Sequence, residues 1–480
     1  MPTDSLYLRT PDSSYKTLVS EGAAANFTMF RMWGGGTYEP DCFYEYCSEY
    51  GILLMHDFMY ACGFYPDHLD SFLFEAEREA EYQTKRLAHY PCMAVWTGNN
   101  EISESYSDWF PAPVKPDRFY GEKVFNYIQP RAVHRNSPTV PYMPSSPYFG
   151  RDPKTKFKFV YELEAFDRIP ARFSSEYGFF GAQMESTVRR YHDGEEMAFD
   201  GEIWKHHGEF DRKRSNIDGA INRHITDFST LDIPGYLTYS GIMQGLLYAE
   251  LAEAMRQKPY GAGDLIWMYN DCWPETGWTI IDYYLTRKVS FYFLKRAFQP
   301  RKLIIRKAEG GARVTVINET PEPITAEIIC GYMTFDGKTD SLCTKTVEAA
   351  PHSWQQFDLA VCNDLQNGFY FASAEGFDTA DSLRAYYRDY VFPESHAKIE
   401  AVEQDGNDLL VTVSADVYTP FAYLMTSDDR VHYSDNYFTL YPNEKKTIRV
   451  ENCTETPALH IAKTMPSDEA QKASYTDSWF

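Results

Sequence analysis

Hydrophobic residues in the first 300 positions gather in short, nearly continuous apolar runs that alternate with segments of helical spacing. Continuous runs of this kind are typical of parallel strands that are buried on both faces. The runs predicted as strands are 28–33, 52–58, 93–98, 140–144, 157–162, 171–177 and 265–271. The alternation with helical segments predicts an α/β fold built on a parallel sheet.

Apolar residues at every third or fourth position predict helices over 41–50, 70–89, 233–257 and 286–298. A closed eight-stranded barrel needs one strand more than these runs supply. Residues 2–7 look like a loop that leaves a strand, so we expect the first strand to precede residue 1. The sequence therefore predicts a (β/α)8 barrel of the TIM type over 1–300, with its first strand missing.

The pattern changes after Pro300, where short alternating runs are separated by turn residues such as Asp336-Gly337. Alternation of apolar and polar residues indicates strands with one buried face. Runs of this kind lie at 313–317 and 356–359, and the style is repeated at 409–413 and 446–450. We expect two all-β immunoglobulin-like sandwiches, over 301–393 and 394–480.

The chain of 480 residues has 46 basic and 69 acidic residues, which gives a formal net charge of −23. A strongly acidic surface argues against nucleic acids and anionic membranes as partners. No apolar stretch approaches the ~18 residues of a membrane-spanning helix. The nine cysteines show no CxxC spacing. Five of them are predicted to be small buried hydrophobic residues, which favours a reducing compartment such as the cytoplasm. These five are Cys42, Cys47, Cys62, Cys92 and Cys272.

Two predicted strands end in a glutamate, Glu101 in the string WTGNNE and Glu176 in the string SSEYG. The carboxyl ends of parallel barrel strands meet at one face, so these side chains are expected to lie close together. Cleavage of a glycosidic bond uses two carboxyl groups, one on each side of the bond. The structural alternative is a helix-capping Glu101 and a buried Glu176 paired with Arg31 or Arg172.

Several strings resemble, in the same order, β-mannosidases of glycoside hydrolase family 2. They are RMWGGGTYEP at 31–40, HDFM at 56–59, WTGNNE at 96–101, SEYG at 175–178 and WMYNDCW at 267–273. SDNYF at 434–438 resembles the last β-module of that family. The family order places a sugar-binding β-domain and an immunoglobulin-like domain before the barrel. The resemblance therefore implies that an N-terminal β-domain segment is a missing partner of this chain.

The resemblance also implies roles for individual residues. Glu101 is the general acid and base, and Glu176 is the nucleophile of a retaining mechanism with a covalent glycosyl-enzyme. Asn100 hydrogen-bonds the 2-hydroxyl of the sugar. No metal or organic cofactor is implied, because two carboxyl groups suffice for this chemistry.

Aromatic residues make up 16% of the chain, and three tryptophans lie in the family strings. Trp33 and Trp267 are candidate walls of the sugar site, with Trp273 behind them. Each could equally be an ordinary core tryptophan. Asp57, at the end of a predicted strand, either binds a sugar hydroxyl or forms an ion pair at the barrel rim.

Three functional hypotheses remain open from the sequence. The first is a retaining exo-β-mannosidase that acts on terminal β-mannosides. The second is another family 2 β-glycosidase, such as a glucosaminidase, galactosidase or glucuronidase. Family β-mannosidases often carry Trp and His before the nucleophile strand, and 157–165 contains neither. The third is a truncated carbohydrate-binding fragment that is inactive without its N-terminal half.

Overall fold

A computed structural model describes residues 3, 4, 6, 9–109, 115–148, 172–199, 201–208, 211–360, 367–384 and 386–464. They form two compact units. The first unit contains the described parts of 1–159, 169–177 and 263–273, and the second contains the rest. Each unit is described by itself below.

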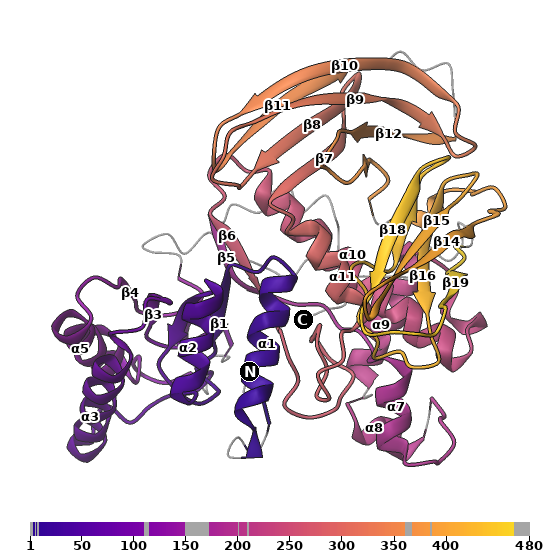
Figure 1. The fold of residues 1–480 in the computed structure, drawn as a ribbon. Helices are drawn as coiled ribbons and strands as arrows, with labels where there is room; N and C mark the ends of the chain where they lie inside the picture. The colour runs from indigo at the N-terminus through magenta and orange to yellow at the C-terminus, as the bar shows by residue number, and fades with distance from the viewer. Residues whose placement is uncertain are drawn as a thin grey trace. The chain divides into compact units, whose positions relative to one another are not determined.

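The first unit is built on parallel strands (Figure 1). One sheet has the order β1 (Met29–Met32), β2 (Leu53–Asp57), β3 (Met93–Thr97) and β4 (Tyr142–Met143). A separate parallel pair is formed by β5 (Phe173–Tyr177) and β6 (Gly263–Ile266). These strands lie within the predicted runs or overlap them, and the run at 157–162 lies outside the described residues. The parallel order is the one a barrel requires, and closure of the barrel stays a prediction.

Register brings the carboxyl ends of the strands level with one another. Asp57 of β2 is paired with Thr97 of β3, and Thr97 with Met143 of β4. Isolated parallel bridges continue this pairing beyond the strands, from Ala61 to Asn100 and from Asn100 to Ser146. The loops that follow β2, β3 and β4 are therefore held side by side.

Two helices of this unit lie at the predicted segments 41–50 and 70–89, and the others were not predicted. The helices are α1 (Asp12–Ala24), α2 (Asp41–Tyr50), α3 (Asp70–Leu87), α4 (Ile102–Glu104) and α5 (Gln129–Asn136), with π-helical turns η2 (Ser105–Trp109) and η3 (Val124–Ile128). Gly51 ends α2 in the left-handed conformation at φ +72°, which glycine adopts without steric cost. The core contains Leu54 of β2, Phe58 directly after that strand and Trp96 of β3, together with Tyr44 of α2 and Leu87 of α3.

The second unit begins with helices. They are α7 (Glu185–His192), α8 (Glu202–His206), α9 (Asp211–His224), the short η4 (Phe228–Thr230), α10 (Ile233–Arg256) and α11 (Val289–Ala297). The prediction for α11 starts at 286, three residues too early. The reason is local, because the backbone N–H of Thr286 donates to Asp282 Oδ1 at 2.9 Å and Arg287 pairs with Ile281.

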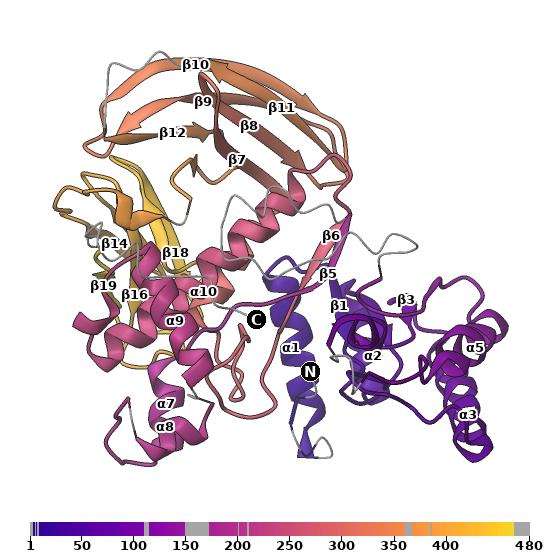
Figure 2. The same ribbon diagram turned by 180° about the vertical axis from the view of Figure 1, so that it is seen from behind.

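The strands of the same unit form two sandwiches (Figure 2). In the first, the sheet β10-β9-β12-β13 is accompanied by the sheet β11-β8-β7. In the second, the sheets are β14-β15-β18 and β17-β16-β19, and η5 (Tyr387–Asp389) precedes them. The strands are β7 (Arg301–Ala308), β8 (Gly311–Asn318), β9 (Ile324–Thr334), β10 (Thr339–Ala349), β11 (Ser353–Ala360), β12 (Gly368–Ser373), β13 (Ala380–Asp381), β14 (Lys398–Asp405), β15 (Asp408–Ser414), β16 (Thr419–Met425), β17 (Phe438–Leu440), β18 (Lys445–Val450) and β19 (Ala458–Ile461).

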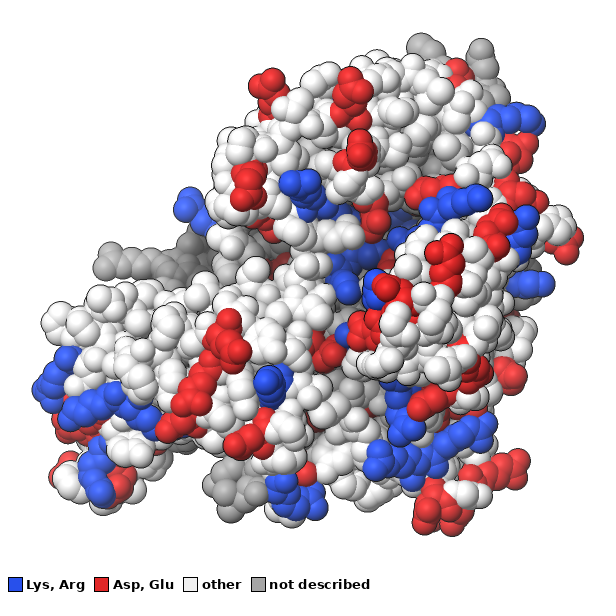
Figure 3. Space-filling view, in the orientation of Figure 1, with Lys and Arg blue, Asp and Glu red and all other residues white. Residues whose placement is uncertain are grey.

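On the face drawn in Figure 3, acidic and basic side chains are interspersed among wide uncharged areas. Among the helices of the described residues, none combines the length and the apolar character that a bilayer crossing demands.

Candidate active site

The polar residues of the candidate site lie at the carboxyl ends of the parallel strands. Arg31 belongs to β1, Asp57 ends β2, and Glu176 belongs to β5. Asn100 and Glu101 follow β3 directly, where the bridges to neighbouring loops hold the chain. This is the face where barrel enzymes carry their chemistry.

Arg31 is the centre of the polar network. Its Nη1 donates to Glu176 Oε2 at 2.8 Å, and its Nη2 donates to Asp57 Oδ2 at 2.7 Å and to Asn100 Oδ1 at 2.6 Å. The Arg31 side chain is only 7% exposed. The sequence predicted Arg31 only as an alternative partner of Glu176 and did not predict its link to Asn100. An arginine inside an apolar strand is the signal that could have found it, because charged residues are buried only when paired.

Glu101 is connected to this network through Asn100. The Nδ2 of Asn100 donates to Glu101 Oε2 at 3.1 Å, and the Sγ of Cys62 lies 3.5 Å from the same oxygen. The backbone N–H of Glu101 donates to the carbonyl of Ser146 at 2.7 Å. The path from Glu101 through Asn100 and Arg31 to Glu176 thus joins the two predicted catalytic carboxyl groups.

Burial raises the pKa of Glu176 to about 7, against the attraction of Arg31. The neighbouring carboxylates of Glu101 and Asp57 add to the upward shift, because like charges disfavour ionisation. Arg31 therefore compensates the negative charge of its surroundings only in part. A carboxyl group that titrates near neutral pH in a cleft is typical of a functional site.

Asp57 is fully buried. Its oxygens accept hydrogen bonds from Arg31 and from the backbone N–H of Gly34 at 3.1 Å. Two roles were predicted for Asp57, and this geometry matches the second, an ion pair at the barrel rim. A Cβ on Gly34 would lie 2.4 Å from the carbonyl oxygen of Tyr60, so only glycine fits beside this strand end.

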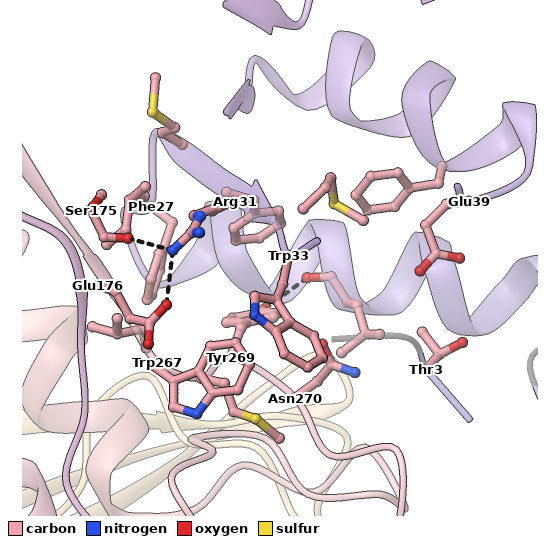
Figure 4. Close-up of a pocket in the computed structure, with 18 of the residues that line it drawn as sticks. Thr3, Phe27, Arg31, Trp33, Glu39, Ser175, Glu176, Trp267, Tyr269 and Asn270 are labelled. Carbon is pink, nitrogen blue, oxygen red and sulfur yellow. Dashed lines mark hydrogen bonds and ion pairs between the residues drawn. The ribbon is translucent and has the colours of Figure 1, made fainter. Parts of the chain in front are cut away.

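A largely apolar pocket adjoins Glu176 (Figure 4). The indole rings of Trp33 and Trp267 both line it and meet edge to face at 5.0 Å. Glu176 and the buried Glu39 lie on opposite sides of Trp33 in this view. Trp273 is 43% exposed and is not among the pocket's lining residues. The structure therefore brings two of the three predicted tryptophans to the site.

The prediction of buried cysteines is wrong in part. Cys47 and Cys92 are buried, as predicted, whereas Cys42 and Cys272 are only half-buried and Cys62 is exposed. Cys62 is exposed because it follows a strand end and belongs to the site face. Within the described ranges, no group of three or more His, Cys, Asp or Glu side chains is placed to hold a metal ion.

Comparison with known proteins finds similarity to β-mannosidases. The Ig-fold domain family Ig_mannosidase matches residues 393–464. A curated relative, beta-mannosidase B of Emericella nidulans, is 28% identical over 64% of this chain and 39% of its own length. Beta-mannosidase B of Aspergillus niger is 26% identical over 73% of this chain and 49% of its own length. The crystal structure of beta-D-mannosidase from Dictyoglomus thermophilum matches with a TM-score of 0.87 and 29% identity, over 98% of this chain and 60% of that chain.

The predicted resemblance to the β-mannosidases of glycoside hydrolase family 2 is confirmed. The relatives and the solved structure also support a fold of a TIM barrel and β-sandwiches. A second solved structure, the exo-chitosanase of Amycolatopsis orientalis, has a TM-score of 0.67 at 15% identity and shows the fold alone. The chain spans less than half the length of the curated relatives it matches.

Proposed function

We propose that this glycoside hydrolase is a retaining exo-β-mannosidase, which removes terminal β-linked mannose through a covalent glycosyl-enzyme. The printed names of the relatives support mannose as the sugar. The observation that carries the mechanism is the asymmetric bridge between the two carboxyl groups. Arg31 contacts Glu176, whereas Glu101 is held by the amide of Asn100.

The asymmetry separates the two roles. A nucleophile must be an anion when it attacks, and the guanidinium of Arg31 favours the ionised form of Glu176. Glu101 forms no ion pair among the described residues. It can therefore carry a proton without leaving a buried cation unpaired. This supports Glu176 as nucleophile and Glu101 as general acid and base.

The reaction runs in two displacements. Glu176 forms a bond to the anomeric carbon while the bond to the leaving oxygen breaks and Glu101 protonates that oxygen. Glu101 then removes a proton from a water molecule, whose oxygen displaces Glu176 from the anomeric carbon. This route requires the two carboxyl groups to stand roughly 5–5.5 Å apart. Asn100 binds the 2-hydroxyl, and Trp33 and Trp267 form walls of the sugar site.

Hydrolysis of 4-nitrophenyl β-mannoside, followed by proton NMR of the first product formed, tests the proposal. We expect β-mannose to appear first and to mutarotate later. Appearance of α-mannose first would contradict retention. Cleavage of the β-glucosaminide, β-galactoside or β-glucuronide in place of the mannoside would show a different sugar. Absence of turnover on all four glycosides would contradict the proposal that this chain is active by itself.

Azide rescue tests the two roles separately. In the Glu101→Ala variant, azide is expected to attack the glycosyl-enzyme and give the β-glycosyl azide. Loss of kcat/KM in this variant should be far larger for a poor leaving group than for 2,4-dinitrophenol, because only the poor one needs the proton. An α-glycosyl azide from Glu101→Ala would exchange the two assignments.

A further inference from the structure

A thiol lies beside the carboxyl group that is proposed as the acid. Cys62 Sγ donates to Glu101 Oε2 at 3.5 Å and accepts from Asn100 Nδ2 at the same distance. Asn100 Nδ2 also donates to Glu101 Oε2 at 3.1 Å. Cys62, Asn100 and Glu101 thus form a closed triangle of side-chain hydrogen bonds. Among the described residues, no group hydrogen-bonds to the other oxygen of Glu101, Oε1.

The backbone holds this triangle in place. The N–H of Cys62 donates to the carbonyl of Asn100 at 3.0 Å, and the N–H of Asn100 donates to the carbonyl of Tyr60 at 2.9 Å. Cys62 has φ +53° and Glu101 has φ +58°. Residues with a side chain rarely adopt this left-handed region, and they do so where the surroundings impose it, often at functional sites.

We propose that Cys62 is a positioning residue for the general acid. Its S–H fixes Oε2 of Glu101, so that Oε1 faces the leaving oxygen of the substrate. The inference rests on the proposed function for the role of Glu101. It adds a residue outside the carboxyl pair and the aromatic walls.

A thiol suits this position because it is a weak donor. It orients the carboxyl group without strongly favouring the ionised form, which a hydroxyl in the same place would favour more. Although the residue is exposed, partial desolvation of its thiol, together with Glu101 and then Glu176, raises the pKa of Cys62 to about 11, so the thiol keeps its proton. The other groups facing the triangle are Tyr65, whose hydroxyl meets the backbone of Ala61, and the ion-paired Arg31 and Asp57 behind Asn100.

Two substitutions at Cys62 test the proposal through the pH profile of kcat/KM. Cys62→Ser, a stronger donor, should move the alkaline limb to lower pH by roughly 0.5, and Cys62→Ala should move it to higher pH. Cys62→Ala should also lower kcat/KM about tenfold for a poor leaving group, the loss of one hydrogen bond. The 2,4-dinitrophenyl glycoside should be little affected. Cys42→Ala, at a half-buried cysteine of α2, is the matched control and should leave both readouts unchanged.

Two outcomes would overturn the proposal, because each would show that Cys62 is merely structural. One is an equal loss of kcat/KM on both substrates. The other is an alkaline limb of the pH profile that stays in place in both Cys62 variants. A second measurement needs no turnover. Alkylation of Cys62 by iodoacetamide at about pH 9, followed by mass spectrometry, should be several-fold faster in Glu101→Gln than in the unchanged chain, because the neighbouring negative charge is removed. Equal rates would overturn the Cys62 proposal even in an active enzyme. Faster labelling in a chain that cleaves no β-glycoside would overturn the proposed function alone.

Discussion

Each unit contains a cluster of buried charged residues, and the two clusters differ in their ratio of carboxylates to cations. In the first unit, Arg31 faces Asp57 and Glu176, and burial raises the pKa of Glu176 to about 7. In the second unit, burial opposes the ionisation of Glu253 in the same way. There, however, Lys302 and Arg306 both reach it at 3.1 Å, and the pKa of Glu253 falls below its ordinary value.

The difference shows that burial alone does not make a carboxyl group reactive. Glu253 of α10 lies among cations of β7, and its neighbour Glu250 is paired with Arg306 and Arg384. No carboxylate of this second cluster lacks a cation, and in that sense it is balanced, so its charges are fixed and stabilise the contact between helix and sandwich. The first cluster has a surplus of carboxylates, so one of them titrates near the pH at which it would work.

The largest expected effect comes from removing the carboxylate of Glu176. Glu176→Gln should lower kcat/KM on the aryl β-mannoside by on the order of 10⁴-fold or more, because the covalent route is lost. Glu253→Gln is the matched control, the same change in the balanced cluster, and should retain activity. Comparable losses in the two variants would mean that the clusters do not differ in function.

The substitution Arg31→Met is expected to have the next largest effect. It leaves Glu176 and Asp57 without their cation, so kcat/KM should fall by about 10²-fold, as for loss of one electrostatic donor. The acidic limb of the pH profile should move to higher pH, because Arg31 opposes the upward shift of the Glu176 pKa. Circular dichroism checks the fold of the variant. A limb that moves to lower pH would contradict the assignment of that limb to Glu176.

Glu253→Gln should act on stability instead. It leaves Lys302 and Arg306 partly unpaired in a buried place, which costs roughly 3 kcal/mol of unfolding free energy. Urea unfolding of the unchanged chain and the variant measures the difference. A midpoint equal to that of the unchanged chain would show that the balanced cluster does not stabilise the second unit.

The smallest effects concern stability against pH, and they have opposite signs. The folded-state pKa of Glu176 lies above 4.5, so its contribution to stability is complete below about pH 4.5 and lost as the pH rises to about 7. The amount is at most about 3 kcal/mol. Glu253, with a lowered pKa, contributes stability above pH 4.5 that is lost on acidification. Melting temperatures of Glu176→Gln and Glu253→Gln, each compared with the unchanged chain from pH 4 to 8, should therefore diverge in opposite directions.

Local signals predicted the parallel strands and some of the helices, and missed others such as α1 and α9. The apolar run at 93–98 forms β3 (Met93–Thr97), and the polar pair Asn99-Asn100 follows it. Asp41 and Gly51 mark the start and the end of α2. The start of α11 was misplaced because Asp282 binds the backbone of Thr286, a side-chain contact that no helical periodicity reports. Trp267 and Trp273 share one motif, yet only Trp267 lines the pocket.

The sequence by itself determined which carboxyl groups end the strands, because a polar residue after an apolar run can be read within a few positions. Tertiary structure alone decided how they act on one another. Arg31 meets Asn100 across 69 positions and Glu176 across 145, and no local pattern records such separations. Contacts between segments that are distant in the sequence set the charge balance around Glu176, and with it the pKa of that residue. Such contacts also place the thiol of Cys62 beside Glu101.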